Sequence, residues 1–469
     1  MATPAATTLG ELRASGWKSR PIKQELRANA AARITAGQPV ASGLVGYDQT
    51  VLPALENALL AGHDIVFLGE RGQAKTRLMR SLVDLLDEWA PIIAGSEILD
   101  DPYAPISRYG RDLVLSKGDE CPVQWVHREQ RFGEKLATPD TSIADLIGEV
   151  DPVKVAEGRY LADELTLHYG LVPRCNRGIF AINELPDLAE RIQVGLLNIL
   201  EERDVQVRGY KIRLPLDIML VASANPEDYT SRGRMITPLK DRFGTQIRTH
   251  YPMDVATEIQ VISQEAGAPE ALGGIAVHMP DYMAELVATI SQLARQSPNI
   301  NQRSGVSVRM GVANYETLVA AAMRRALRLG ESEAIPRVSD IGALLYSTAG
   351  KIEVDSLDDD GEEEVFQRVA RQAVSSVFRS RVDAAVLAAA VSGLNDGSFV
   401  EVGEDIPTAS YLKALEEHPG FSRPVQDLAG SSSPAALAAA LELVLEGLHL
   451  SKRLNKNSDA GTARYSSRR

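Results

Sequence analysis

The residues of this chain that could do chemistry begin with a glycine-rich loop that ends in a lysine and a threonine. The loop follows the apolar run Ile65–Leu68 and precedes apolar residues at helical spacing (Leu78, Leu82, Leu85, Leu86 and Trp89). Backbone N–H groups of such a loop wrap phosphates, the lysine neutralises β- and γ-phosphate oxygens, and the hydroxyl binds Mg²⁺. We therefore predict a P-loop for ATP and Mg²⁺ at Gly69-Glu70-Arg71-Gly72-Gln73-Ala74-Lys75-Thr76. The alternative is a glycine-rich turn with an exposed lysine.

The loop departs from the usual Gly-x-x-x-x-Gly-Lys-Ser/Thr pattern at Ala74, where the last glycine would stand. We expect Ala74 to adopt helical dihedral angles, which carry no penalty for a Cβ atom. On this expectation the added methyl group leaves the phosphate site intact.

A second candidate is the apolar run Gly178–Ile182, which ends in Asn183 and Glu184. A carboxylate at the end of a strand beside a P-loop polarises a water for attack on the γ-phosphate, so Glu184 is the candidate general base. Asn183 stands where an aspartate usually holds Mg²⁺ through its water shell. An amide orients that water but adds no charge, which is compatible with weaker Mg²⁺ binding or slower turnover. The alternative is a buried strand that ends in a polar turn.

Two further polar residues follow expected elements. Asn225 comes after another apolar run and before a proline, where its amide could bond the γ-phosphate or the attacking water, a role called sensor 1. Arg242 precedes the last expected strand and could reach the nucleotide of a neighbouring subunit. The alternatives are an ordinary Asn-Pro turn and a salt bridge from Arg242 to Asp241 or another neighbour. Arg232 and Arg234 are weaker candidates for the same interface.

These candidates need a parallel sheet to bring them together. From about Val40 to Pro252, short apolar runs alternate with helical stretches, as in a parallel sheet with crossover helices. The expected strands are Ile65–Leu68, Val123–His127, Gly178–Ile182, Ile218–Ala222 and Thr245–Thr249. After Pro252 the expected elements are the helices Ala256–Ala266, Pro280–Gln296, Val312–Leu329 and Pro434–Leu450, the last with an N-cap in the preceding serines.

The chain divides into five expected parts. Residues 1–40 form a leader with a helix near Pro21–Ala36, which packs on the next domain or is mobile. An α/β nucleotide-binding core covers 41–252 and a helical lid covers 253–350. Residues 351–450 form an acidic linker and a helical C-terminal extension, and the basic tail 451–469 is expected to be disordered. The acidic run Ile352–Phe366 is interpreted as a solvated linker or helix entry, with a partner-docking strip as the alternative.

Composition excludes several classes of protein. Against 63 acidic residues the chain has 50 Lys and Arg, and the net charge of −13 makes nucleic acid an unlikely partner. Two cysteines provide neither a disulfide framework nor a Cys-rich zinc cluster and favour a reduced, cytoplasmic setting. No export signal is visible, and no run approaches the roughly 18 apolar residues that favour a membrane span. We therefore expect no membrane insertion.

Taken together, the motifs resemble the AAA+ ATPases, specifically the branch of magnesium chelatase I subunits and MoxR ATPases. The resemblance covers about residues 41–350 and rests on Val45-Gly46, Gly72-Gln73-Ala74-Lys75-Thr76, the segment Asn176–Glu184, Ala224-Asn225-Pro226-Glu227 and Leu239-Lys240-Asp241-Arg242-Phe243. The Ala-Lys-Thr ending is similar to MoxR proteins, whereas Asn-Arg-Gly-Ile at 176–179 is similar to chelatase. Asp151–Cys175 and Val205–Arg213 resemble the helix-2 insert and pre-sensor-1 hairpin of this branch. The Gly-Ala-Phe-Thr-Gly-Ala motif of sigma-54 activators is absent, which argues against that relative.

The resemblance implies a P-loop AAA+ core with a five-stranded parallel sheet, a helical lid and, beyond it, a helical extension. It implies Arg309 as sensor 2, with Arg303 as the fallback. It also implies a homo-oligomeric ring, commonly a hexamer, with the nucleotide between subunits and a client protein that carries a von Willebrand A domain.

Three functions stay open at this point. The first is a MoxR/chelatase-like ATPase that remodels or activates a partner, with or without metal-cofactor insertion. The second is an authentic magnesium chelatase I subunit that drives Mg²⁺ into protoporphyrin IX. The third, motivated by Asn183, is an ATP-binding ring scaffold with little hydrolysis.

Overall fold

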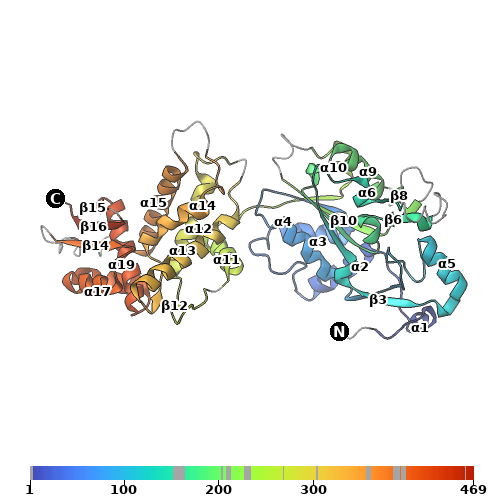
Figure 1. Ribbon diagram of the computed structural model, residues 1–469, viewed down its shortest axis with the longest axis horizontal. Coiled ribbons are helices and arrows are strands. Elements are labelled where there is room, and N and C mark those ends of the chain that lie inside the picture. Colours follow the sequence, from blue (N-terminus) through green and yellow to red (C-terminus); the bar gives the residue numbers. More distant parts are fainter. Residues whose placement is uncertain are drawn as a thin grey trace. The chain divides into compact units, whose positions relative to one another are not determined.

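The computed structural model describes residues 4–151, 164–201, 204–206, 213–225, 234–267, 269–302, 305–354, 361–383, 391, 398–459 and 461–468. Two compact units make up the chain, Met1–His250 and Tyr251–Arg469 (Figure 1). Arg232, Arg303 and the acidic residues 355 and 358–360 lie outside the described residues.

A five-stranded parallel sheet forms the centre of the first unit, as the sequence predicts. Its strands are β1 (Ile65–Leu68), β4 (Phe132–Leu136), β7 (Gly178–Asn183), β10 (Ile218–Ala224) and β11 (Thr245–Arg248), in the spatial order β11-β1-β10-β7-β4. All neighbouring strands run parallel. Because β10 lies between β1 and β7, the ends of these three strands lie side by side.

The prediction is wrong for one strand of the central sheet. Val123–His127 forms a strand, β3, but it pairs antiparallel with β2 (Trp89–Ile93) in a separate two-stranded sheet. The fifth place in the central sheet belongs to β4, which is partly exposed along most of its length. Its sequence, Phe-Gly-Glu-Lys-Leu, has few apolar residues because an edge strand does not need to be buried on both faces.

The helix after the glycine loop is also shorter than predicted. It covers α4 (Lys75–Ser81) and continues as a 3₁₀ helix over Leu82–Leu85. Trp89 is the first residue of β2 and does not belong to this helix.

Helices cover both faces of the central sheet (Figure 1). Successive residues of β1 enter different cores, because side chains alternate along a strand. Ile65 and Phe67 pack with α2, α3 and α4, whereas Val66 belongs to the core that holds α9 and α10. The other helices of this unit are α1 (Leu9–Ala14), α2 (Ile22–Thr35), α3 (Val51–Ala61), α5 (Arg108–Lys117), α6 (Ile143–Leu146), α8 (Leu171–Arg174), α9 (Glu190–Glu201) and α10 (Thr237–Arg242). The leader helix α2 thus packs on the α/β core.

Two short antiparallel pairs lie at or beside the ends of the segments that resemble family inserts. They are β5 (Gly148–Val150) with β6 (Leu167–Tyr169), and β8 (Asp204–Gln206) with β9 (Arg213–Pro215). The second pair forms the two arms of the predicted pre-sensor-1 hairpin. The centre of that hairpin, 207–212, and the segment 152–163 lie outside the described residues.

The second unit is mainly helical. Its helices are α11 (Val255–Ala266), α12 (Asp281–Gln296), α13 (Val308–Leu329), α14 (Leu344–Thr348), α15 (Glu362–Arg381), α17 (Thr408–Glu417), α18 (Ser422–Ala429) and α19 (Pro434–Leu450). The predicted N-cap of α19 is present, since the Ser433 hydroxyl accepts a hydrogen bond from Ala436 N. Short parallel strands β12 (Ala276–Val277) and β13 (Glu333–Ala334) pair between the helices.

The basic tail is ordered, contrary to prediction. Within 451–469, β15 (Leu454–Asp459) and β16 (Thr462–Ser467) form an antiparallel hairpin, and β16 also pairs with β14 (Phe399–Gly403). Leu454 and Tyr465 are buried in the core beside α19, and Lys456 Nζ lies 2.7 Å from Glu446 Oε2. The burial of these apolar groups and the pairing of basic side chains offset the charge that suggested disorder.

The described part of the acidic run supports its interpretation as a helix entry. Glu362, Glu363 and Glu364 form the first turn of α15, where negative charge is favourable beside the helix dipole. Within the described residues, no single helix is both long and apolar enough to cross a membrane. One bent pair, Pro419–Ala429 with Pro434–Leu450, meets the length and composition criteria jointly.

Candidate functional site

The main candidate site lies at the carboxyl ends of β1, β10 and β7. The glycine loop follows β1, Asn225 follows β10, and Asn183 and Glu184 stand at the end of β7. Gly69 N donates to Ala224 O at 3.1 Å and so joins the loop to β10. Open parallel sheets bind ligands at such an edge, where the strand order changes direction.

Lys75 is a buried member of this group. Its Nζ donates to Gly69 O at 2.5 Å, Glu70 O at 2.8 Å and Asn225 Oδ1 at 2.6 Å. The residue is 6% exposed. The alternative of a glycine-rich turn with an exposed lysine is therefore wrong.

Residues without a predicted role hold the glycine loop in shape. The side-chain oxygen of Gln73 accepts hydrogen bonds from Glu70 N at 3.1 Å and from Thr249 Oγ1 at 2.8 Å. The hydroxyl of Tyr47 donates to Gln73 O at 2.9 Å. A Cβ atom on Gly69 would lie 1.9 Å from Thr249 Oγ1, so the loop requires glycine there. Thr249 directly follows β11, and its place at the shared edge was the signal that could have identified it.

The rest of the loop is more open. Arg71 is exposed, and Gly72 has a φ of 78°, which favours glycine. Ala74 has φ 52° and ψ 19°, so our expectation of helical dihedral angles is wrong. This left-handed conformation costs a residue with a Cβ atom about 1–2 kcal/mol. Glu184 is also left-handed, with φ 55° and ψ 47°. Such strain gathers at functional sites more often than elsewhere.

Asn225 connects the lysine to the candidate base. Its Oδ1 accepts from Lys75 Nζ, and its Nδ2 donates to Glu184 Oε2 at 2.6 Å. The backbone of Glu184 is fixed by a hydrogen bond from its N to Ser223 Oγ at 3.0 Å. The three predicted residues thus form one continuous line of hydrogen bonds across the ends of the strands.

Asn183 connects the threonine of the loop to a carboxylate that the sequence analysis missed. Its Oδ1 accepts from Thr76 Oγ1 at 3.1 Å and from Ser223 Oγ at 3.2 Å, while its Nδ2 donates to Glu134 Oε1. Glu134 also binds Arg80, with Nε to Oε2 at 2.6 Å. This hydrogen bond and the carboxylate charge raise the pKa of Arg80. Glu134 was missed because β4 was not predicted.

The donors around Asn183 suit Mg²⁺. Thr76 offers a hydroxyl oxygen, Asn183 an amide oxygen, and Glu134 a carboxylate bonded to that amide. Mg²⁺ prefers oxygen ligands and usually keeps several of its waters. The residues present therefore fit this ion.

None of the contacts described for the predicted arginines is with the strand-end group. Arg242 is the last residue of α10 and donates from Nη1 to Pro238 O at 3.0 Å. Arg234 is exposed. Arg309 is exposed in the first turn of α13, in the second unit, and its backbone N donates to Ser307 Oγ.

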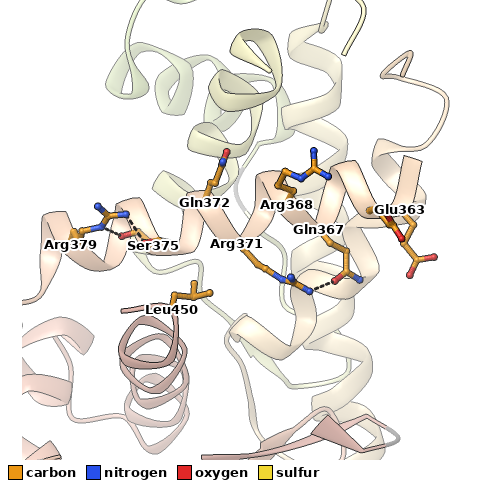
Figure 2. A pocket seen from close by; sticks show the side chains of 9 residues that line it. Glu363, Gln367, Arg368, Arg371, Gln372, Ser375, Arg379 and Leu450 are labelled. Atoms are coloured by element: carbon orange, nitrogen blue, oxygen red, sulfur yellow. Dashed lines mark hydrogen bonds between the residues drawn. The ribbon is translucent and has the colours of Figure 1, made fainter. Parts of the chain in front are cut away.

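A separate hollow of about 810 Å³ lies in the second unit, along α15 and beside Leu450 (Figure 2). Arg371 donates to Gln367 Oε1 at 3.2 Å, and Arg379 donates to Ser375 Oγ at 2.8 Å. These arginines bond to their own helix, and Glu363 and Glu364 also line the hollow. Its lining combines both signs of charge and contains no glycine loop, so we do not assign the nucleotide to it.

Comparison with known protein families finds a match within the first unit. The model of the family described as the sigma-54 interaction domain matches residues 157–243. The matched segment includes β7, β10 and α10 but not the glycine loop. The absence of the Gly-Ala-Phe-Thr-Gly-Ala motif argues against similarity to sigma-54 activators, but for this segment that prediction is wrong.

Curated relatives are chelatase subunits. The magnesium-chelatase 38 kDa subunit of Cereibacter sphaeroides is 30% identical over 239 residues, which cover 48% of this chain and 62% of that protein. The magnesium-chelatase subunit ChlI of a Nostoc species is 28% identical over 233 residues, 48% of this chain and 58% of that protein. The match thus spans less than two thirds of either relative.

Among solved structures, a chain from the complex between subunits BchI and BchD of magnesium chelatase aligns with 68% of this chain and 97% of its own length. The identity is 20% and the TM-score 0.35, so this likeness adds nothing to the assignment.

The sheet order, the glycine loop and the polar residues at the ends of the strands define a P-loop protein of the AAA+ class. Within that class, the chain is homologous to the I subunit of magnesium chelatase, at about 30% identity. The resemblance to the chelatase branch is confirmed, whereas the resemblance to MoxR proteins stays a prediction.

Proposed function

We propose that this chain hydrolyses ATP at the strand-end group and uses the energy to remodel or activate a partner protein. The observation that carries the proposal is the line of hydrogen bonds from Lys75 through Asn225 to Glu184. It joins a cation suited to phosphate, an amide suited to the γ-phosphoryl and a carboxylate suited to a water. Those three groups are what phosphoryl transfer to water requires.

Each residue has a distinct proposed role. The loop Gly69–Thr76 holds the phosphates, and Lys75 exchanges its carbonyl partners for phosphate oxygens. Thr76 and Asn183 would hold Mg²⁺ through their side-chain oxygens. The ion, when bound, neutralises charge on the phosphates. Glu184 accepts the proton of the attacking water, and Asn225 keeps Glu184 and the γ-phosphate in line.

The remaining roles depend on an assembly. We propose a homo-oligomeric ring, with a hexamer as the expected size, in which Arg242 reaches the nucleotide of the next subunit and Arg309 acts as sensor 2 from the lid. The proposed client is a protein with a von Willebrand A domain, and the proposed location is the cytoplasm. Homology to the chelatase I subunit supports a partner protein, since the relatives are named as subunits of an enzyme with several subunits.

The direct test is phosphate release from ATP with Mg²⁺. Glu184→Gln should lower the rate at least about 100-fold and still bind ATP, because it removes the base but keeps the shape of the side chain. Glu190→Gln, an exposed glutamate at the start of α9, is the matched control and should keep the wild-type rate. If the wild type binds ATP but releases no phosphate with Mg²⁺ in excess, hydrolysis is excluded and the ring scaffold becomes the better account.

The homology favours a second candidate, an authentic magnesium chelatase I subunit. This candidate is tested with ATP, protoporphyrin IX and the two other chelatase subunits, by the fluorescence of magnesium porphyrin. Absence of product, with an active I subunit as the positive control, would remove it.

A further inference from the structure

The starting point is the neutral side chain at a position that usually carries charge. Asn183 closes β7, and its amide oxygen faces the Thr76 hydroxyl. An amide has two ends, an oxygen that can accept from a metal-bound water and an NH₂ group that cannot. Something must therefore decide which end faces Thr76.

Glu134 decides it. In the pairing of β4 with β7, Glu134 lies opposite Ala181 and Leu136 lies opposite Asn183. Glu134 is thus a diagonal neighbour of Asn183 on the same face of the sheet. Its carboxylate accepts from Asn183 Nδ2, which leaves Oδ1 toward Thr76. The reversed amide would point an oxygen at the carboxylate and lose this charge-assisted hydrogen bond.

Arg80 partly neutralises the negative charge of Glu134 by pairing with it. It extends from α4 and binds both carboxylate oxygens, with Nε to Oε2 at 2.6 Å and Nη2 to Oε1 at 3.1 Å. The Arg80 side chain is 63% exposed and that of Glu134 is 21% exposed. Because the guanidinium end of this ion pair is exposed, the pair contributes little to stability.

We propose that Glu134 is a positioning residue for Mg²⁺ at the ATP site. It fixes the amide of Asn183 and places beside it the negative charge that an aspartate at 183 would carry. Arg80 opposes this effect by drawing the same carboxylate to itself. The inference rests on the proposed function, since it needs ATP and Mg²⁺ at this site.

The test is a binding experiment and requires no turnover. The affinity of a fluorescent ATP analogue is measured twice for each variant, in EDTA and in saturating Mg²⁺. The affinity in Mg²⁺ divided by the affinity in EDTA is the ratio compared between variants. By thermodynamic linkage, this ratio changes by the same factor as the Mg²⁺ affinity of the complex between protein and analogue. The variants are Glu134→Gln, Arg80→Gln, Asn183→Asp and the double variant Asn183→Asp with Glu134→Gln.

The expected results differ in sign. Glu134→Gln should lower the ratio about tenfold, as loss of a residue that orients a metal ligand does. Arg80→Gln should raise it, because the carboxylate is then free to act on Asn183. In the Asn183→Asp background, Glu134→Gln should leave the ratio unchanged or raise it, since residue 183 then supplies the charge itself.

A purely structural ion pair makes a different prediction. Glu134→Gln and Arg80→Gln would then lower the melting temperature alike and leave the ratio within twofold of wild type, which would overturn the inference. The Arg80 variant keeps the test decisive if Glu134→Gln does not fold. If the wild type binds the analogue in neither condition, the proposed ATP site itself fails and the inference falls with it. If the wild type binds the analogue but no variant changes the ratio, the proposed role of Glu134 fails and the ATP site stands.

Discussion

The strand-end group around Lys75 in the first unit and a second group around Arg337 in the other unit both bury a cation among oxygen atoms. Lys75 is 6% exposed and Arg337 is fully buried. Lys75 donates to two main-chain carbonyls and the amide of Asn225. The Nη2 atom of Arg337 lies 3.6 Å from Glu331 Oε2, and its backbone N donates to Asp340 Oδ2 at 2.8 Å.

The second group is a closed network between helices. Arg337 donates to Ile406 O at 2.9 Å and Thr408 Oγ1 at 2.6 Å, and its guanidinium lies 4.5 Å from the centre of the Tyr411 ring. Tyr411 in turn donates to Glu442, which also accepts from Ser339 N at 2.7 Å. Burial raises the pKa of Glu442. The network joins these elements through hydrogen bonds to carbonyl, hydroxyl and carboxylate oxygens.

The two groups differ in the partners of the buried cation, and this difference separates a ligand site from a structural network. In the second group, the Arg337 guanidinium also forms an ion pair with Glu331, and removing either member leaves a buried charge without compensation. In the first group, Lys75 donates to two main-chain carbonyls and an amide oxygen at the carboxyl end of a parallel sheet, beside two residues with left-handed backbones. The glycine loop also offers backbone N–H groups to a phosphate, so we assign the ligand to the first group.

The largest effect is expected from breaking the second group. Arg337→Met should lower the free energy of unfolding by about 3 kcal/mol or more, because Glu331 and Glu442 lose a buried counter-charge. Arg324→Met removes an exposed ion pair to Glu404 instead and should cost less than about 1 kcal/mol. Hydrogen exchange of the amides of α19 measures both. Equal protection in the two variants would contradict the structural role of Arg337.

The next effect tests the first group. Asn225→Ala removes the bridge between Lys75 and Glu184 and should lower the rate of ATP hydrolysis about 100-fold, with a smaller effect on ATP affinity. The matched control is Asn29→Ala, since Asn29 bonds Leu85 O and Asp87 Oδ1 at 2.9 Å in the same unit. That variant should lose stability and keep its rate. If both variants keep the rate, Asn225 acts only in folding.

The smallest effect concerns strain in the loop. Relief of the left-handed conformation by Ala74→Gly is worth about 1–2 kcal/mol, and the added freedom of glycine in the unfolded chain costs about 0.5–1 kcal/mol. We therefore expect a net gain between zero and about 1.5 kcal/mol in a urea titration. Ala32→Gly, at an exposed interior position of α2, should lose about 1 kcal/mol instead. Destabilisation by both substitutions would show that Ala74 is not strained.

The sequence predicted the parts of the site that follow apolar strands. Lys75, Asn183, Glu184 and Asn225 each stand directly after such a strand or in the loop that continues it, so the parallel sheet brings them together. Glu134 could not be found in this way, because its strand lies at the sheet edge and lacks an apolar pattern. The conformation of Ala74 depends on the tertiary shape of the loop, which residue type does not reveal.

The tail teaches the same lesson in the second unit. Its charge suggested disorder, but Leu454 and Tyr465 pack beside α19 and Lys456 pairs with Glu446. Local charge did not indicate these partners, since they lie in another element. Predictions from local pattern succeeded where burial follows the period of a strand or helix, and failed where a distant partner decides the outcome.

The central claim is that the strand-end group binds ATP through Lys75, and equilibrium titration with ATP and Mg²⁺ tests it most directly. Lys75→Ala should weaken binding at least about tenfold, because charge-assisted hydrogen bonds to phosphate are lost. Lys23→Ala removes a lysine whose Nζ lies 2.9 Å from the buried Asp64 and should leave ATP affinity near wild type. Wild-type affinity in Lys75→Ala, or equal loss in the two variants, would contradict the account.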